Sequence, residues 1–206
     1  IKAVAVTAGY ICAEARKEFF QYMDAVNVDL KAFSEEFYQK LCSVSLKDTL
    51  DSLLYLKNET DVWFEITTLL IPDENDSVEE IDAMTKWIYD NLGADIPLHF
   101  SAFHPDYKMV DKGRTPLQTL LRARDIAVKN GLNYVYTGNV WHPETSSTYC
   151  SNCKEKIIGR DYYEVSFWNL DEEGECNKCQ KRCSGVFNGG AGHWGNKRSL
   201  MEIKEE

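Results

Sequence analysis

The sequence lacks long hydrophobic runs, an excess of basic residues, and any repeated or low-complexity segment. No stretch approaches the run of about 18 apolar residues that marks a transmembrane helix, so we expect no membrane span. The 23 lysines and arginines are outnumbered by 33 aspartates and glutamates, which gives a formal net charge of −10 at pH 7. Because an acidic chain repels phosphate backbones, general nucleic-acid binding is disfavoured.

The N-terminus also lacks features that usually mark a natural start. The first ten residues, "IKAVAVTAGY", contain no initiator methionine and no basic segment followed by an apolar one. Their composition is that of the interior of a β-strand. We therefore expect the chain to be a fragment whose start is missing, so the lack of a leader peptide says little about its compartment.

The 206 residues, 44% of them hydrophobic, suit one globular domain with a small appendage. Strand-like and helix-like stretches alternate. The expected strands cover residues 3–10, 25–33, 61–71, 97–103 and 134–138. The expected helices cover residues 13–24, 34–42, 46–58, 77–93 and 115–131, with Pro116 at the first position of the last one. This order predicts an α/β fold with a parallel sheet, and a barrel or partial barrel would need further strands at the front.

The character of the sequence changes near Thr148, where long helical patterns give way to cysteines, glycines and short β-like runs such as residues 162–168. We therefore expect two domains, an α/β domain over residues 1–145 and a small cysteine-rich domain over residues 146–206.

Four of the seven cysteines form two C-x-x-C pairs, Cys150 with Cys153 and Cys176 with Cys179, separated by the 22 residues 154–175. Each pair lets two thiolates reach one ion, and two pairs complete a tetrahedral site. With no open coordination position, the pattern predicts a structural Zn(II) site that stabilises a small zinc-ribbon-like segment. Paired cysteines favour metal in a reducing compartment over disulfides, so we expect a cytoplasmic protein.

Two other interpretations of the cysteines stay open. Cys176, Cys179 and Cys183 have the spacing C-x2-C-x3-C, which could seat three irons of a four-iron cluster but would leave the first pair without a purpose. Alternatively, the four cysteines of the two C-x-x-C pairs are unrelated free thiols. A nucleic-acid-binding ribbon is disfavoured, because residues 148–206 contain nine basic and ten acidic residues.

Polar side chains follow several of the expected strands. In "VNVDLKAF", Asn27, Asp29 and Lys31 alternate with apolar residues and so share one face, with the last two at the carboxyl end. His104 and Asn139 follow two later strands in the same way. Ligands of parallel α/β folds bind at this edge, so the four strand-end residues predict a site there. The alternative is that Asp29 and Lys31 form only a salt bridge and that His104 is a loop residue.

The motifs together resemble the radical SAM enzyme of the AmmeMemoRadiSam system, a family similar to pyruvate formate-lyase activating enzymes. The segments that carry the resemblance, in chain order, are "VTAGYI", "NVDLKAFSEEFY", "TTLLIPDENDS", "LHFSAFHPDYKM", "YVYTGNV" and "TYCSNC…CNKC…GVF". The resemblance runs nearly end to end, and the motifs are specific as a set although each alone is weak.

The resemblance implies a partial (α/β) barrel that binds a [4Fe–4S] cluster and S-adenosylmethionine (SAM). Such enzymes cleave SAM reductively to a 5′-deoxyadenosyl radical, which abstracts hydrogen from a substrate, and the activating enzymes act on a protein. It further implies that Asp29, Lys31 and His104 contact SAM, and Asn139 lies at the same rim. A carboxylate suits the ammonium of the methionine moiety, and a lysine suits its carboxylate. A protein substrate and an electron donor are the expected partners.

Two family features are missing from this sequence. The cluster loop C-x3-C-x2-C is absent, as is the Gly-Gly-Glu stretch expected before the third strand. Cys12 and Cys42 are isolated, and Cys183 is a cysteine where the family tends to have another residue. We therefore expect this chain to hold only the second half of the barrel, and the cluster ligands to lie in the missing part. The rival hypotheses are a non-catalytic zinc-ribbon module that binds a protein partner, and a barrel enzyme that uses His104 as acid–base.

Overall fold

The computed structural model describes residues 2–187 and 190–192 of the chain. The chain divides into two compact units, Ile1–Val140 and Trp141–Glu206, a little before the boundary expected from the sequence. Among the described residues, no helix is both long and apolar enough to cross a membrane.

The first unit is built on a five-stranded parallel sheet in which the strands are neighbours in the order of the sequence. The strands are β1 (Val4–Thr7), β2 (Ala25–Asp29), β3 (Trp63–Leu70), β4 (Leu98–Ala102) and β5 (Val135–Gly138). Every neighbouring pair is parallel, which confirms the expected α/β fold with a parallel sheet.

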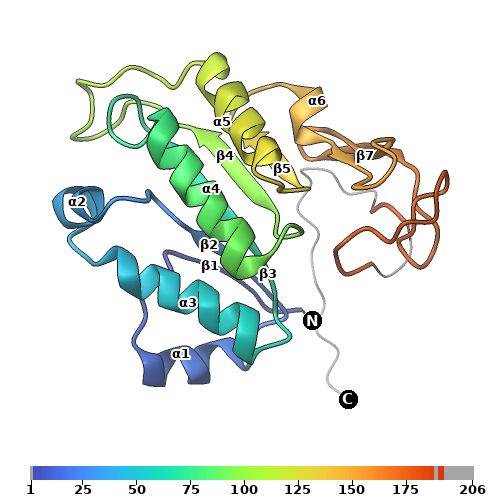
Figure 1. Cartoon of the computed structure of the whole chain (residues 1–206), viewed down its shortest axis with the longest axis horizontal. Coiled ribbons are helices and arrows are strands. Elements are labelled where there is room, and N and C mark those ends of the chain that lie inside the picture. Colours follow the sequence, from blue (N-terminus) through green and yellow to red (C-terminus); the bar gives the residue numbers. More distant parts are fainter. Residues whose placement is uncertain (1, 188–189, 193–206) are drawn as a thin grey trace, which may run out of the picture. The chain divides into compact units, whose positions relative to one another are not determined.

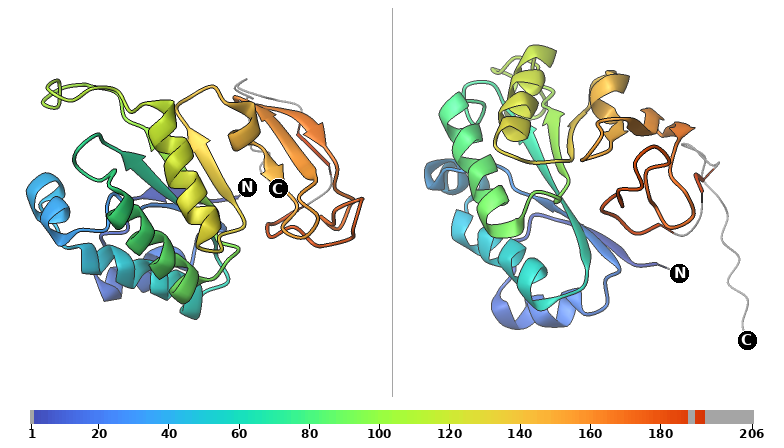
Figure 2. Two further views of the ribbon diagram at one scale, coloured as in Figure 1. Left: turned by 45° about the horizontal axis from the view of Figure 1, so that its top comes forward. Right: turned by 45° about the vertical axis from the view of Figure 1, so that its right-hand side comes forward.

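The helices that connect successive strands lie along one face of this sheet, as Figures 1 and 2 show. They are α1 (Ala13–Phe20), α3 (Leu46–Glu59), α4 (Val78–Leu92) and α5 (Leu117–Lys129). Sequential strand order with right-handed crossovers places every connecting helix on the same side. A short helix α2 (Glu35–Phe37) and a π-helix (Tyr38–Cys42) also lie between β2 and α3.

Helix α4 shows how the local sequence determines an element. The Ser77 hydroxyl accepts the backbone N–H of Glu80 at 3.2 Å and so caps the first turn. Gly93, with φ of 101°, ends the helix in a conformation that side chains disfavour. The apolar stripe of the helix is buried against the sheet and consists of Ile81, Met84, Ile88 and Leu92.

The two faces of the sheet differ in chemistry. Side chains that point toward the helices, including Val26, Val28, Ile66, Leu98 and Phe100, are buried and form the main core. Residues at the alternate positions of β2 to β5 are half-buried and mostly polar, whereas Val4 and Val6 at these positions of β1 are apolar and exposed. This second face is called the polar face here, and its residues include Asn27, Asp29, Glu65, Thr67, His99, Ser101 and Tyr136.

Several elements are shorter than the sequence predicted. Strand β2 ends at Asp29 rather than near residue 33, because the backbone of Lys31 bonds to side chains instead of to a neighbouring strand. Pro116 has an extended backbone, with ψ of 146°, so it occupies the N-cap position before α5 rather than the first helical position. The single helix expected over residues 34–42 is α2 continued by the π-helix.

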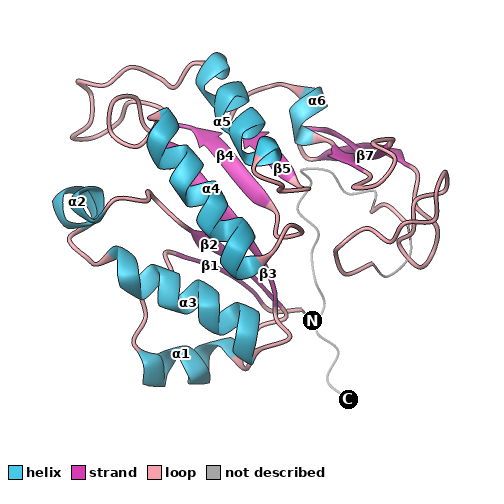
Figure 3. Ribbon diagram, in the orientation of Figure 1, coloured by secondary structure: helices cyan, strands magenta, loops and turns pink. Residues whose placement is uncertain are grey.

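The second unit contains the short helix α6 (Pro143–Ser146) and a three-stranded antiparallel sheet. Its strands are β6 (Thr148–Tyr149), β7 (Lys156–Asp161) and β8 (Glu164–Trp168). Figure 3 shows that the described chain after β8 consists of loops. The first cysteine pair lies between β6 and β7, and the second pair follows β8.

Candidate functional site

The carboxyl end of β2 carries a close pair of opposite charges. Asp29 is the last residue of the strand, and Lys31 follows on the same side of the chain because Leu30 between them is buried in the core. Lys31 Nζ lies 2.5 Å from Asp29 Oδ2, and the two side chains are 37% and 29% exposed. The predicted alternation is confirmed, and the pair is accessible to a ligand at the end of the strand.

The other two predicted site residues also lie beyond strand ends. His104 is exposed and follows β4 by two residues. Asn139 directly follows β5 with φ of 59°, and its Nδ2 donates to the carbonyl oxygen of Ala102 at 3.1 Å. Among the described residues, no hydrogen bond or ion pair joins His104 or Asn139 to Asp29 or Lys31. The structure therefore pairs two of the four residues and places the others beyond the ends of β4 and β5, which β3 separates from β2.

The polar face also holds a set of side chains that the sequence analysis missed. His99 Nε2 lies 2.6 Å from Glu65 Oε2, and the other carboxylate oxygen accepts the indole N–H of Trp63 at 3.2 Å. The imidazole stacks on the ring of Tyr136, with centroids 4.9 Å apart. A carboxylate that holds one ring nitrogen orients the imidazole for hydrogen bonding or proton transfer through the other.

The register of the sheet explains how these residues meet. Thr67 pairs with His99, and His99 pairs with Tyr136, so residues distant in sequence share one row of the polar face with Asp29. The signal available in the sequence was a pair of polar residues two positions apart in each of two expected strands, Glu65 and Thr67 in one and His99 and Ser101 in the other. That signal did not reveal which residues would become partners.

The four cysteines of the second unit converge on one point. Their Sγ atoms all lie within 4.8 Å of one another. Cys150 Sγ is 3.5 Å from Cys179 Sγ, and Cys153 Sγ is 3.7 Å from Cys176 Sγ. These separations are too long for disulfides. A tetrahedral ion with metal–sulfur bonds of about 2.3 Å needs sulfur–sulfur separations of about 3.8 Å.

Two turns of the same design hold the two pairs. Lys154 and Gln180 each follow the second cysteine of a pair with φ near 60°, and each donates its N–H to the carbonyl of the first cysteine, at 3.1 Å and 2.7 Å. The N–H of Cys150 in turn bonds the carbonyl of Glu155, and that of Cys176 bonds the carbonyl of Lys181. This repeated geometry points both thiols of each turn toward the same place.

Hydrogen bonds and the neighbouring thiols shift the pKa values of two of these cysteines in opposite directions. The backbone N–H of Lys181 and the side chain of Asn152 lower the pKa of Cys179 to about 6. The backbone N–H of Glu155 favours the Cys153 thiolate, but burial and the three neighbouring thiols outweigh it and raise the pKa of Cys153 to about 12. A metal ion would displace the remaining protons. The four sulfurs therefore form a group that could bind a metal.

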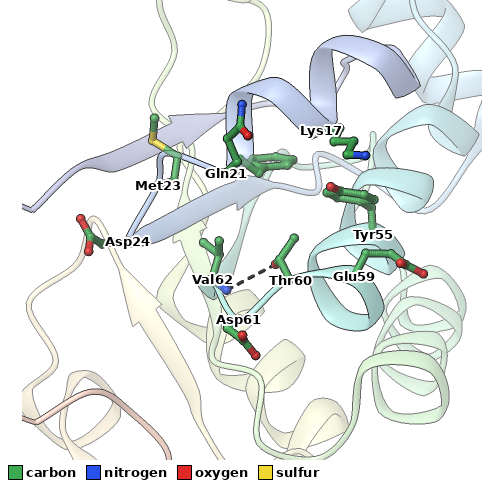
Figure 4. Close-up of a pocket in the computed structure, with 10 residues that line it drawn as sticks. Lys17, Gln21, Met23, Asp24, Tyr55, Glu59, Thr60, Asp61 and Val62 are labelled. Atoms are coloured by element: carbon green, nitrogen blue, oxygen red, sulfur yellow. Dashed lines mark hydrogen bonds between the residues drawn. The ribbon is translucent and has the colours of Figure 1, made fainter.

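A surface pocket of about 500 Å³ lies at the opposite ends of the strands, near the start of β2 and β3. Figure 4 shows its lining, which includes Lys17, Asp24, Tyr55, Glu59 and Asp61. It contains none of the site residues predicted from the sequence. Asp24 already pairs with Lys2 at 2.8 Å, and the pocket forms no part of the strand-end site.

Comparison with curated proteins finds two relatives from Methanocaldococcus jannaschii. One is an uncharacterised protein, 39% identical over 180 residues, which are 87% of this chain and 53% of the relative. The other carries the provisional name glycyl-radical enzyme activating enzyme and is 28% identical over 110 residues, which are 52% of this chain and 42% of the relative. The chain thus spans about half the length of these relatives. No protein-family model matches it.

Solved structures show a similar fold. A domain of pyruvate-formate lyase-activating enzyme from Bacteroides vulgatus has a TM-score of 0.57 at 17% identity and covers 66% of this chain and 80% of that domain. A radical SAM methyltransferase from Sphaerobacter thermophilus has a TM-score of 0.54 at 14% identity and covers 65% of this chain and 39% of the enzyme. At these identities the likeness concerns the fold alone: the chain shares a parallel α/β fold with these two solved structures.

Proposed function

We propose that this chain is part of a radical SAM enzyme of the activating-enzyme type and forms the second half of its partial barrel. In such enzymes SAM is cleaved reductively and a hydrogen atom is removed from the substrate. In this proposal, Asp29, Lys31, His104 and Asn139 contact SAM, and the cluster ligands come from a part of the protein outside this chain. A protein substrate and an electron donor are the proposed partners, and the proposed compartment is the cytoplasm.

The observation that carries the proposal is the Asp29–Lys31 pair at the carboxyl end of β2. Its two charges match the ammonium and carboxylate of the methionine moiety of SAM, and both side chains are accessible. The sequential parallel sheet, with its helices on one face, leaves a polar face that suits the interior of a barrel. The fold likeness to an activating-enzyme domain supports the same assignment.

The iron–sulfur cluster does not fit the cysteines of this chain. Cys12 is exposed at the start of α1 and Cys42 ends the π-helix, and neither belongs to a group of cysteines. The Sγ atoms of the other group lie within 4.8 Å of one another, which is the arrangement for a single ion; they belong to Cys150, Cys153, Cys176 and Cys179. We therefore assign the redox cofactor to no residue described here.

We further propose that the four cysteines bind one structural Zn(II) ion in a zinc-ribbon-like domain over residues 146–206, which follows the barrel domain of residues 1–145. The sulfur separations of 3.5 and 3.7 Å suit a single tetrahedral ion. A cubane cluster would hold its thiolates on four separate irons, which demands more space between the sulfurs. Cys183 is buried but lies outside the four-sulfur group.

The decisive experiment measures SAM binding and 5′-deoxyadenosine formation by the complete protein after anaerobic cluster reconstitution. We expect binding and, with a reductant, cleavage. A non-catalytic zinc-ribbon module would bind neither SAM nor a cluster, and an acid–base barrel enzyme would lose nothing when the cluster is omitted. A complete protein without C-x3-C-x2-C, or without SAM binding, would refute the proposal.

A further inference from the structure

The four residues after β2 leave the sheet, and side chains hydrogen-bond to the backbone of three of them, Leu30, Lys31 and Phe33. Thr68 Oγ1 donates to the carbonyl oxygen of Leu30 at 2.8 Å. The backbone N–H of Phe33 donates to a carboxylate oxygen of Glu80 at 2.6 Å. Between these two contacts lies Lys31, whose backbone is held on both sides.

Two buried side chains hold the Lys31 backbone. Its N–H donates to the hydroxyl of Tyr38 at 3.0 Å, and its carbonyl oxygen accepts from Asn75 Nδ2 at 2.6 Å. Tyr38 is 1% exposed and Asn75 is 3% exposed. They come from different elements, the π-helix after β2 and the loop after β3.

Asn75 is itself fixed to the end of β3. Its Nδ2 also donates to the carbonyl oxygen of Leu69 at 2.9 Å, and its Oδ1 accepts the N–H of Ile71 at 2.6 Å. All three of these hydrogen bonds are inaccessible or partly inaccessible to water, where a lost partner is costly. Asn75 therefore ties the Lys31 backbone to the end of β3.

A lysine ammonium at the end of a flexible four-carbon chain is a poorly placed charge unless its backbone is fixed. Binding a small zwitterion needs that charge at a defined distance from the opposite one, here Asp29, and pre-organisation reduces the cost of ordering it. We propose that Tyr38 and Asn75 are positioning residues for SAM binding, which hold the Lys31 backbone so that its ammonium faces the ligand. This inference rests on the proposed function.

The test is a double-mutant cycle on SAM affinity, measured by calorimetry with the complete, cluster-reconstituted and unreduced protein. Tyr38→Phe keeps the buried ring and removes only the hydroxyl. We expect it to weaken SAM binding about three- to ten-fold, the worth of one hydrogen bond. In a Lys31→Ala background the same change should have no further effect, because the charge to be positioned is gone.

Matched controls separate positioning from stability. Thr85→Val removes another buried hydroxyl, which donates to the carbonyl of Ile81 at 2.8 Å inside α4, and should cost stability without changing SAM affinity. Asn75→Asp is a second variant, which tests the hydrogen bond to the Lys31 carbonyl. It keeps the acceptor for the Ile71 N–H and loses the donor to Lys31. It should also weaken binding where the variant remains folded by circular dichroism.

The outcomes distinguish this inference from the function on which it rests. If the complete protein binds no SAM, or if Lys31→Ala binds it as tightly as wild type, the proposed site itself is wrong and the inference fails with it. If Lys31→Ala weakens binding but Tyr38→Phe leaves the affinity unchanged, or weakens it equally in both backgrounds, only the positioning role is refuted.

Discussion

Lys31 Nζ and Asp29 Oδ2 lie 2.5 Å apart at the carboxyl end of β2, on side chains that are 37% and 29% exposed. A partly exposed pair of this kind stabilises a fold by only about 0–1 kcal/mol. Because both side chains are accessible, the two charges can also bind a ligand. The contact between them is also the arrangement that the salt-bridge interpretation predicts, so a binding measurement must decide.

The first prediction concerns Lys31→Ala in the complete, reconstituted protein. SAM binding should weaken by the worth of a charge-assisted hydrogen bond, on the order of 1.5–3 kcal/mol, or roughly ten- to a hundred-fold in Kd. Stability should change little. Lys86→Ala, which breaks a pair with Asp82 at 2.6 Å on α4, is the control and should leave SAM affinity intact. Equal calorimetric affinities for Lys31→Ala and wild type would leave Asp29 and Lys31 as a simple salt bridge.

The second prediction concerns metal content. The purified chain should carry one zinc per molecule, and chelation should unfold the second unit because its small sheet depends on the ion. Cys150→Ser should abolish zinc binding, whereas Cys42→Ser, a change at a half-buried isolated thiol, should retain it. Elemental analysis tests this directly. An iron chromophore that survives Cys183→Ser but not Cys150→Ser would contradict the assignment to zinc.

The sequence was most informative where one chain segment decides the outcome. Alternation in "VNVDLKAF" predicted that Asp29 and Lys31 share a side, and two C-x-x-C turns predicted the convergence of four sulfurs. The alternation depends on the two-residue period of a strand, and the pairing within each C-x-x-C depends on the reach of one turn. The meeting of the two turns is not local, since Cys150 and Cys179 are 29 positions apart, and it was predicted because one tetrahedral ion needs four ligands.

Contacts that depend on strand register were not predictable in the same way. Glu65 and His99 are 34 positions apart, and their meeting requires the alignment of β3 with β4. Asn75 lies in "PDENDS", which has the composition of an ordinary loop, so nothing local revealed a side chain buried against Lys31. His104 was chosen for its place after a strand, and among residues 2–187 and 190–192 no hydrogen bond or ion pair to it is found.

The third prediction concerns pH and Glu80. Burial raises the pKa of the Glu80 carboxyl, against the opposing effect of the Phe33 N–H, and the charge of Asp76 raises it further. Because the folded-state pKa lies above the unfolded value, the folded state binds more protons between the two values. The stability that Glu80 contributes is therefore full below the unfolded pKa, about 4.3, and is lost as pH rises through the folded pKa.

Glu80→Gln isolates this contribution, since its amide oxygen can still accept the Phe33 N–H. Urea unfolding at about pH 4 and about pH 7 should show that the wild type loses stability relative to the variant as pH rises. Glu74, whose pKa is lowered by its hydrogen bond with Lys112, is a control of opposite sign. Glu74→Gln should be least stable relative to wild type at the higher pH. A wild-type advantage over Glu80→Gln that grows with pH would contradict the burial argument.

The fourth prediction is that this chain, tested alone, does not cleave SAM even after anaerobic iron–sulfur reconstitution. Cleavage needs an electron delivered through a cluster bound next to the sulfonium, and such a cluster needs three suitably spaced thiolates. Four of the seven cysteines surround a single point, and Cys12, Cys42 and Cys183 are not spaced as C-x3-C-x2-C. The complete protein, reconstituted in parallel, is the positive control.

5′-Deoxyadenosine above a no-protein blank, measured by liquid chromatography, would mean that the chain binds a redox cluster of its own. Cys176→Ser and Cys183→Ser would then show whether the C-x2-C-x3-C segment binds that cluster. Loss of the cluster in both variants would mean that this segment binds iron and that the zinc assignment is wrong.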